Sequence, residues 1–142
     1  MILPDVNVLV HAFRDDAPRH KEFKTWLDDV VKSDEALGVS DFVLSGFLRI
    51  ATHAGIFKPP SAPEEALPFA DAFRLLPNAV FLSPGPRHWD IFSRLCRTTN
   101  ARGNLVPDAY LAALAIESGA ELITANRDFA RFPGLRWRHP LA

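Results

Sequence analysis

The chain has 142 residues, of which 48% are hydrophobic and 23% charged, enough apolar material for one continuous core and a single domain over residues 1–142. The formal net charge of −1 excludes the overall basic excess that binds nucleic acid nonspecifically. The charge is uneven, because residues 1–83 carry 8 basic and 12 acidic side chains (net −4) and residues 84–142 carry 8 and 5 (net +3). The later part can therefore present a local basic surface.

Several features predict a cytoplasmic protein without a membrane partner. The single cysteine, Cys96, excludes an intrachain disulfide and a cysteine-rich metal site, which fits a reducing compartment. The apolar opening is interrupted by Asp5 and Asn7 and has no basic lead-in, so it does not resemble a signal peptide. No stretch approaches the roughly 20 apolar residues that a membrane span requires.

Strands and helices are predicted to alternate along the first part of the chain. In chain order we expect a strand at 1–4, helices at 6–13 and 19–32, a strand at 37–40 and a helix from 41 to about 53. The second of these helices rests on Phe23, Trp26 and Leu27 at helical spacing. Ser40 is the expected N-cap of the third helix.

The alternation continues behind a proline-rich loop at 58–63. We expect a helix opening at 64, a strand at 79–82, a helix at 87–99, a helix opened by Pro107-Asp108, a strand at 121–124, a turn at 125–129 and a last strand at 135–137. Gly119 is expected to end the helix that Pro107-Asp108 opens. Strands that alternate with helices predict an α/β fold with a mostly parallel sheet, covered by helices on both faces.

Four aspartates follow predicted strands or open the helices behind them: Asp5, Asp41, Asp108 and Asp128. In a right-handed parallel arrangement these positions share one edge of the sheet. Crowded carboxylates repel one another unless a cation neutralises them, and hard divalent ions such as magnesium (Mg2+) or manganese prefer oxygen ligands. Such an ion can activate a water and stabilise the charge of a phosphodiester under attack.

Each acid also has a structural explanation. Asp41 and Asp108 could serve only as helix-start residues, and Asp128 could be an ordinary turn acid. Asp5 is harder to explain in this way, because a charge at the end of an apolar strand is costly unless it is paired or ligated. Asn7 could support a metal ligand or hydrogen-bond the local turn.

Four segments of the chain, in their order and spacing, resemble the PIN-domain ribonucleases and, more narrowly, the VapC toxins of type II toxin–antitoxin pairs: residues 3–10, 44–52, 106–115 and 124–129. The resemblance implies a three-layer α/β/α PIN-like domain with a central sheet of four or five strands. It implies an endoribonuclease that binds Mg2+, with manganese as a substitute. It also implies a homodimer and a cognate VapB-type antitoxin that occupies the active-site groove.

Carried over residue by residue, the resemblance assigns Asp5 and Asp108 to direct metal coordination. Family members usually have an acid in the helix after the second strand, often a glutamate, and here Gly46 stands where some relatives carry it. Asp41 is the only nearby acid, and we take it as the expected substitute.

The fourth position of the family's site is also altered. Many relatives place an aspartate two residues after the threonine, whereas this chain has Asn126 two residues after Thr124 and Asp128 two residues beyond. Asn126 can support the site through its amide oxygen, but it brings no charge. One well-held ion is therefore expected, and a second is less secure.

The RNA backbone must also be bound, and arginines flank the two late motifs. The candidates are Arg87, Arg97, Arg102 and Arg127, since a guanidinium can pair with two phosphate oxygens at once. Exposed arginines on helices are, however, commonly solvated charge without such a role.

Two other functions remain open at this stage. Because Asn126 lacks charge, the chain could be a catalytically weak PIN module that binds RNA or a partner protein without cleavage. A doubly wound phosphatase with Asp5 as covalent nucleophile would usually need a second acid two residues on, where Asn7 stands. The sequence therefore favours a metal-dependent endoribonuclease that acts as a toxin, with a metal-activated water as nucleophile.

Overall fold

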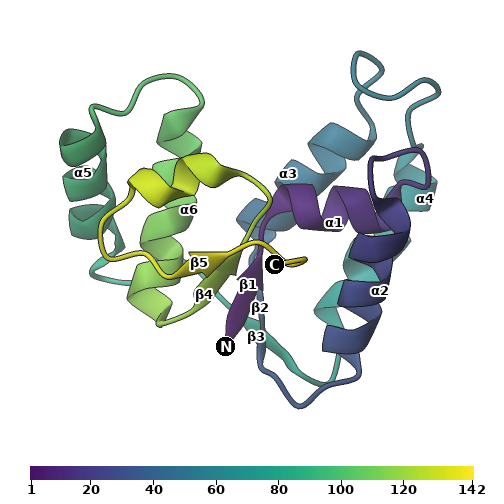
Figure 1. Ribbon diagram of the computed structural model, residues 1–142, viewed down its shortest axis with the longest axis horizontal. Helices are drawn as coiled ribbons and strands as arrows, with labels where there is room; N and C mark the ends of the chain where they lie inside the picture. Colours follow the sequence, from purple (N-terminus) through teal and green to yellow (C-terminus); the bar gives the residue numbers. More distant parts are fainter.

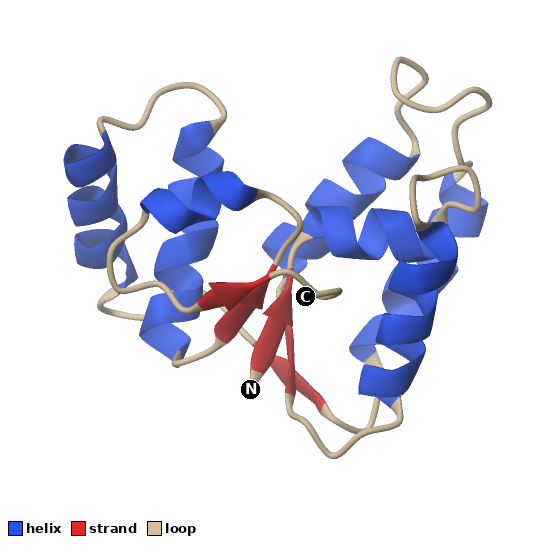
Figure 2. Ribbon diagram, viewed as in Figure 1, coloured by secondary structure: helices blue, strands red, loops and turns tan.

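The strands form one parallel sheet. The computed structural model describes residues 1–142. Its strands are β1 (Ile2–Pro4), β2 (Leu37–Val39), β3 (Ala79–Phe81), β4 (Glu121–Ile123) and β5 (Trp137–Arg138). They lie side by side in the order β3-β2-β1-β4-β5, and every neighbouring pair is parallel. The prediction of a mostly parallel sheet of four or five strands is confirmed (Figure 2).

Helices cover both faces of this sheet. They are α1 (Val6–Phe13), α2 (His20–Val31), α3 (Asp41–Ala51), α4 (Pro63–Arg74), α5 (His88–Thr99) and α6 (Leu105–Ser118), followed by a short 3-10 helix, η1 (Arg127–Arg131). Figure 1 shows α5 and α6 on one side of the sheet and α1 to α4 on the other. The predicted three-layer α/β/α arrangement is confirmed. None of the helices has the length and apolar character needed to cross a membrane.

The core lies between the central strands and the helices packed on them. Every residue of β1 and β2 is buried, and one cluster of 30 buried hydrophobic residues joins these strands to both helical layers. Helix α6 contributes a continuous buried stretch, residues 111–115. The edge strand β3 is different, since Val80 and Phe81 are exposed. Such continuous burial is expected of interior parallel strands that are covered on both faces.

The strand order reverses direction at β1. From β1 the chain builds β2 and β3 on one side, and it returns later to add β4 and β5 on the other. In open α/β sheets the ligand cleft lies outside the carboxyl ends of the strands at such a switch point. The register pairs Pro4 with Ile123, so the next residues, Asp5 and Thr124, are neighbours at this edge.

Two elements near this edge differ from the expectation. Helix α6 begins at Leu105, before Pro107 and Asp108, because a proline is tolerated in a first turn, where backbone N–H groups have no intrahelical partner. Much of the turn expected at 125–129 is occupied by η1, which Asn126 caps through its side-chain oxygen. These differences move the boundaries of the elements, but they keep the polar residues at the carboxyl edge.

Candidate active site

Asp5 lies directly after β1 and caps the N-terminus of α1, and it is only 7% exposed. Its Oδ1 accepts a hydrogen bond from the Val6 backbone N–H at 2.7 Å. Its Oδ2 accepts from Thr124 Oγ1 at 2.8 Å and from Asn7 Nδ2 at 3.1 Å. Burial raises the pKa of Asp5, and the hydrogen bonds from Thr124, Val6 and Asn7 oppose that rise. The three donors therefore stabilise a carboxylate that would otherwise be costly to bury.

Thr124 and Asn7 connect the loop after β4 to α1. The hydroxyl oxygen of Thr124, which is fully buried, accepts from the Asn126 backbone N–H at 3.0 Å and from Asn7 Nδ2 at 3.1 Å. Asn7 Oδ1 accepts from the Ala125 backbone N–H at 3.1 Å. The three residues selected from the sequence as supporting thus form one hydrogen-bonded network around Asp5. This network fixes the direction of its carboxylate.

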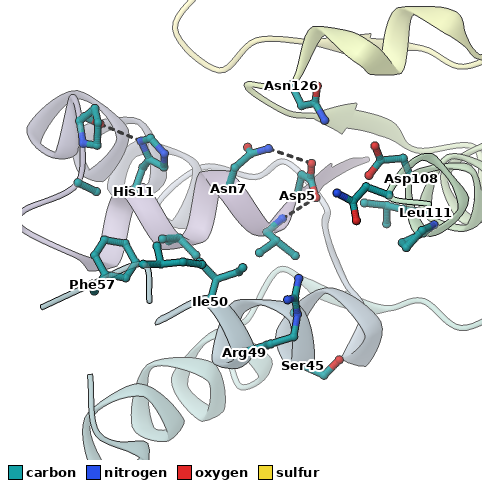
Figure 3. A pocket seen from close by; sticks show the side chains of 18 of the residues that line it. Asp5, Asn7, His11, Ser45, Arg49, Ile50, Phe57, Asp108, Leu111 and Asn126 are labelled. Carbon is teal, nitrogen blue, oxygen red and sulfur yellow. Dashed lines mark hydrogen bonds between the residues drawn. The ribbon is translucent and has the colours of Figure 1, made fainter. Parts of the chain in front are cut away.

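Asp108 lies in the first turn of α6 and lines the same cavity as Asp5 (Figure 3). Its carboxyl group is half-buried. This burial, together with the negative charges of Asp5 and Asp128, raises the pKa of Asp108 to about 6. The raised pKa means that ionised Asp108 is disfavoured beside the other carboxylates. A cation bound between them would remove this cost.

The cavity has a volume of about 1040 Å³ and is bounded by α1, α3, α6 and the loops that follow α1, α3 and β4. Figure 3 shows Asp5, Asp108 and Asn126 at one end, with His11 and Phe57 at the other. Ligand pockets commonly span about 300 to 1,000 Å³, so this one has room for an extended ligand. Its acidic end coincides with the switch point of the sheet.

The groups at the acidic end suit a hard divalent cation. Asp5 and Asp108 offer carboxylate oxygens, and Asn126 adds a neutral amide beside them. Mg2+ commonly takes only one or two carboxylates from a protein and keeps several waters. No three acidic, histidine or cysteine side chains gather closely enough to hold an ion together. The residues present therefore fit one ion held by two carboxylates, with much of its coordination left to water and substrate.

The other two aspartates selected from the sequence lie outside the cavity lining. Asp41, at the start of α3, has a side chain that is 79% exposed and pairs with Arg74 at 3.2 Å. Neighbouring residues of a helix point about 100° apart around its axis. Phe42 lines the cavity, so the preceding residue, Asp41, lies off the side of α3 that faces it. Asp128 is exposed on η1, yet its charge contributes to the raised pKa of Asp108. The structure thus brings Asp128 near the site, whereas it directs Asp41 elsewhere.

The four arginines selected from the sequence also lie outside the cavity lining. Arg87 donates to the carbonyl oxygen of Glu117 at 3.2 Å, near the end of α6 opposite to Asp108. Arg97 is exposed on α5, Arg102 precedes α6 and Arg127 begins η1. None of the four therefore contributes to the lining that contains the two carboxylates.

The basic groups that do line the cavity are Arg49, Lys58 and His11. Arg49 lies in the 44–52 segment that resembles the PIN family, but the sequence assigned no role to any of the three. On α3, the lining residues are Phe42, Ser45, Gly46, Arg49 and Ile50, at the helical spacing i, i+3, i+4, i+7 and i+8. The apolar stripe of this helix is buried on its other side. In the sequence this side of the helix is a mixed stripe of polar, small and apolar residues, and its spacing alone does not indicate a binding surface.

At Gly46, α3 lies in close contact with the start of α1. A Cβ atom at this position would lie 2.8 Å from Val6 Cγ2, well inside contact distance. Valine is stiff at χ1, so its methyl group cannot easily move away. The position that carries an acid in some PIN relatives thus has no room for a longer side chain here. The side of α3 that lines the cavity, here called the α3 wall, carries Arg49 and no acid.

Comparison with known proteins agrees with this geometry. The sequence profile of the PIN domain matches residues 2–135, and the chain belongs to the PIN-domain family. Among individual relatives, Ribonuclease VapC43 of Mycobacterium tuberculosis is 45% identical over 141 residues, which cover 99% of this chain and 96% of the relative. Ribonuclease VapC25 of the same organism is 39% identical over 140 residues, 99% of both chains. The resemblance inferred from the motifs is confirmed.

Solved structures share the fold over the whole chain. VapBC2 from Rickettsia felis, determined bound to a DNA fragment from its promoter, aligns with a TM-score of 0.71 and 20% identity over 98% of each chain. VapBC-1 from nontypeable Haemophilus influenzae aligns with a TM-score of 0.70 and 17% identity over 100% of each chain. At this identity the likeness supports the α/β/α architecture of the chain.

Proposed function

We propose that the protein is a metal-dependent endoribonuclease and the toxin of a type II toxin–antitoxin pair. The observation that carries this proposal is the cavity at the switch point, which Asp5 and Asp108 both line and in which neither forms an ion pair with the protein. The names of the full-length relatives, which are VapC ribonucleases, support the same function. RNA in the cytoplasm is the substrate that this function implies.

In this proposal Asp5 and Asp108 hold one Mg2+ ion, for which Mn2+ is a substitute. When bound, the ion would neutralise both carboxylates, polarise the phosphodiester and promote loss of a proton from water. The chain itself orients the site: Thr124 and Asn7 donate hydrogen bonds to Oδ2 of Asp5, which fix the direction of its carboxylate and oppose the rise of its pKa caused by burial. The Asn126 backbone N–H donates to Thr124 within the loop after β4, and the Ala125 N–H donates to Asn7 Oδ1, which keeps this loop beside α1.

Two protein partners follow from the same proposal. The solved relatives include toxin–antitoxin complexes such as VapBC2 and VapBC-1, so we propose a cognate VapB-type antitoxin that covers the cavity of this chain. We also propose a homodimer, as implied by membership of the VapC group. Co-purification with the product of an adjacent small gene, followed by mass measurement of the complex, tests both.

The decisive experiment compares the wild-type protein with Asp5→Asn on total RNA in magnesium and in EDTA. We expect discrete cleavage products only from the wild type in magnesium. Asp71→Asn is the matched control, because Asp71 is exposed on α4 and lies outside the cavity. Circular dichroism of each variant separates loss of activity from loss of fold.

Intact RNA after incubation with folded wild-type protein and magnesium would refute the nuclease proposal. Retained RNA binding in that case would favour a PIN module that binds without cleavage, which the lack of a third converging acid makes a relevant alternative. Sequencing the 5′ ends of RNA after brief expression, with Asp5→Asn as control, would identify the RNA that is cut.

A further inference from the structure

Arg49 is the only arginine that lines the cavity, and it forms no ion pair. Other arginines of the chain have protein partners: Arg14 with Asp16, Arg19 with Glu22, Arg74 with Asp41, Arg87 with Glu117, Arg136 with Gly119 and Arg138 with Glu121. Arg49 therefore keeps its guanidinium donors available on the wall that faces the site. Asp16, which also lines the cavity, is already paired with Arg14.

The position of Arg49 is set by the contact between α3 and α1. Gly46 lies against Val6, the residue that follows Asp5, so this part of α3 is held beside the start of α1. Arg49 comes three residues later on the same cavity-facing stripe. In Figure 3 its guanidinium points from α3 into the cavity, toward the end that holds Asp5.

We infer that Arg49 binds a phosphate of the RNA chain next to the bond that is cut, opposite Asp5 and Asp108. This inference rests on the proposed nuclease function. Two carboxylates alone would repel a phosphodiester, whereas a guanidinium offers a fixed positive charge and two parallel N–H donors to the phosphate oxygens. Gly46 and Asn126 stand where relatives carry acids, so this chain has fewer ligands for a second metal ion. Arg49 instead supplies positive charge to the cavity from α3.

The predicted contact is electrostatic, and it makes and breaks no covalent bond. Because Arg49 is solvent-exposed before RNA binds, the contact is formed only in the complex. A lysine at this position would keep the charge but lose the paired donors. We therefore expect Arg49→Lys to retain part of the function and Arg49→Gln to retain least.

The test measures binding apart from cleavage. In the Asp5→Asn background with magnesium, a fluorescein-labelled single-stranded RNA of mixed sequence is titrated by anisotropy at several salt concentrations. Adding Arg49→Gln should weaken binding on the order of 10-fold or more, the loss expected for a hydrogen bond to a charged group. The slope of log K against log salt should fall by about 0.7, as for one lost phosphate contact to a single strand. Arg94→Gln is the control, since Arg94 is exposed on α5 outside the cavity.

Cleavage by the otherwise wild-type protein gives the second measurement. Arg49→Gln should lower kcat/KM by about 10- to 100-fold, with Arg49→Lys between it and the wild type. Unchanged affinity and salt slope in Arg49→Gln, matching Arg94→Gln, would overturn the inference while leaving the nuclease proposal intact. So would loss of binding to a co-purified antitoxin with normal RNA binding, because Arg49 would then belong to the protein interface. Absence of cleavage by the wild type would instead refute the nuclease function.

Discussion

Replacing Asp108 by asparagine should stabilise the metal-free protein and abolish RNA cleavage at the same time. In the folded state Asp108 is half-buried beside Asp5 and Asp128, and these surroundings raise its pKa to about 6. Ionised Asp108 is therefore a cost that the free protein carries at neutral pH. The neutral amide removes that cost, but it also removes a carboxylate that the proposed metal site requires.

The size of the effect follows from the pKa. The difference between about 6 and the ordinary value of 3.8 corresponds to about 3 kcal/mol at roughly 1.36 kcal/mol per pKa unit. Asp108 is about half exposed, so solvent screens much of this interaction, and we expect about 1 kcal/mol. For a domain of this size, about 1 kcal/mol raises the melting temperature by roughly 2 to 5 °C.

The pH dependence makes the prediction specific. The unfolded chain releases the Asp108 proton near the ordinary pKa of 3.8, whereas the folded chain holds it up to about pH 6. Between these values the folded state binds more protons, so the wild type loses stability as the pH rises from about 4 to about 6. The stability advantage of Asp108→Asn should therefore be full above about pH 6 and absent below about pH 4.

Thermal unfolding of the wild type and Asp108→Asn in EDTA, at neutral pH and near pH 4, measures the stability difference and its dependence on pH. Magnesium should then stabilise the wild type more than the variant, because a ligand that binds only the folded state raises its stability. If Asp108→Asn melts at or below the wild-type temperature at neutral pH in EDTA, the electrostatic reasoning is wrong. The same holds if the difference persists unchanged near pH 4.

Two further substitutions test the α3 wall. Gly46→Ala should destabilise the protein by about 1 to 3 kcal/mol, because the new methyl group would be overpacked against Val6. The same change at an exposed helix position stabilises a protein by about 1 kcal/mol. Urea denaturation of the variant and the wild type measures the free-energy difference. Asp41→Asn should leave RNA cleavage within about threefold of the wild type and change stability by less than about 1 kcal/mol, because Asp41 is exposed and forms a surface ion pair with Arg74; a cleavage assay measures the rate.

Each of these substitutions has its own control. Adding Val6→Ala to Gly46→Ala should restore much of the lost stability, since the smaller side chain leaves room for the new methyl group. No rescue by Val6→Ala would mean that the contact is not the cause. A loss of cleavage in folded Asp41→Asn comparable to that in Asp5→Asn would mean that Asp41 does replace the family's helix acid.

Much of the secondary structure could be read from the sequence, because it depends on local signals. The helix at 6–13 was predicted with its observed bounds, and the strands at the start and near 37, 79 and 121 were each found within a residue at either end. The least accurate predictions were the last strand, expected at 135–137 and found at Trp137–Arg138, and the start of α6, which lies two residues before Pro107. A proline anywhere in a first turn gives the same local signal, so its position within that turn cannot be read from the sequence.

The tertiary structure alone decided which polar groups meet. The sequence by itself determined that Asp5 follows a buried strand and begins a helix, and that Asp108 lies in a helix start, because both depend on neighbouring residues. That Thr124 donates to Asp5 across 119 positions depends on the pairing of β1 with β4. That Arg49 rather than Asp41 faces the cavity depends on the rotation of α3 against α1, which the Gly46 contact fixes. Strand register and helix rotation arise from packing between distant segments, and no short stretch of sequence encodes them.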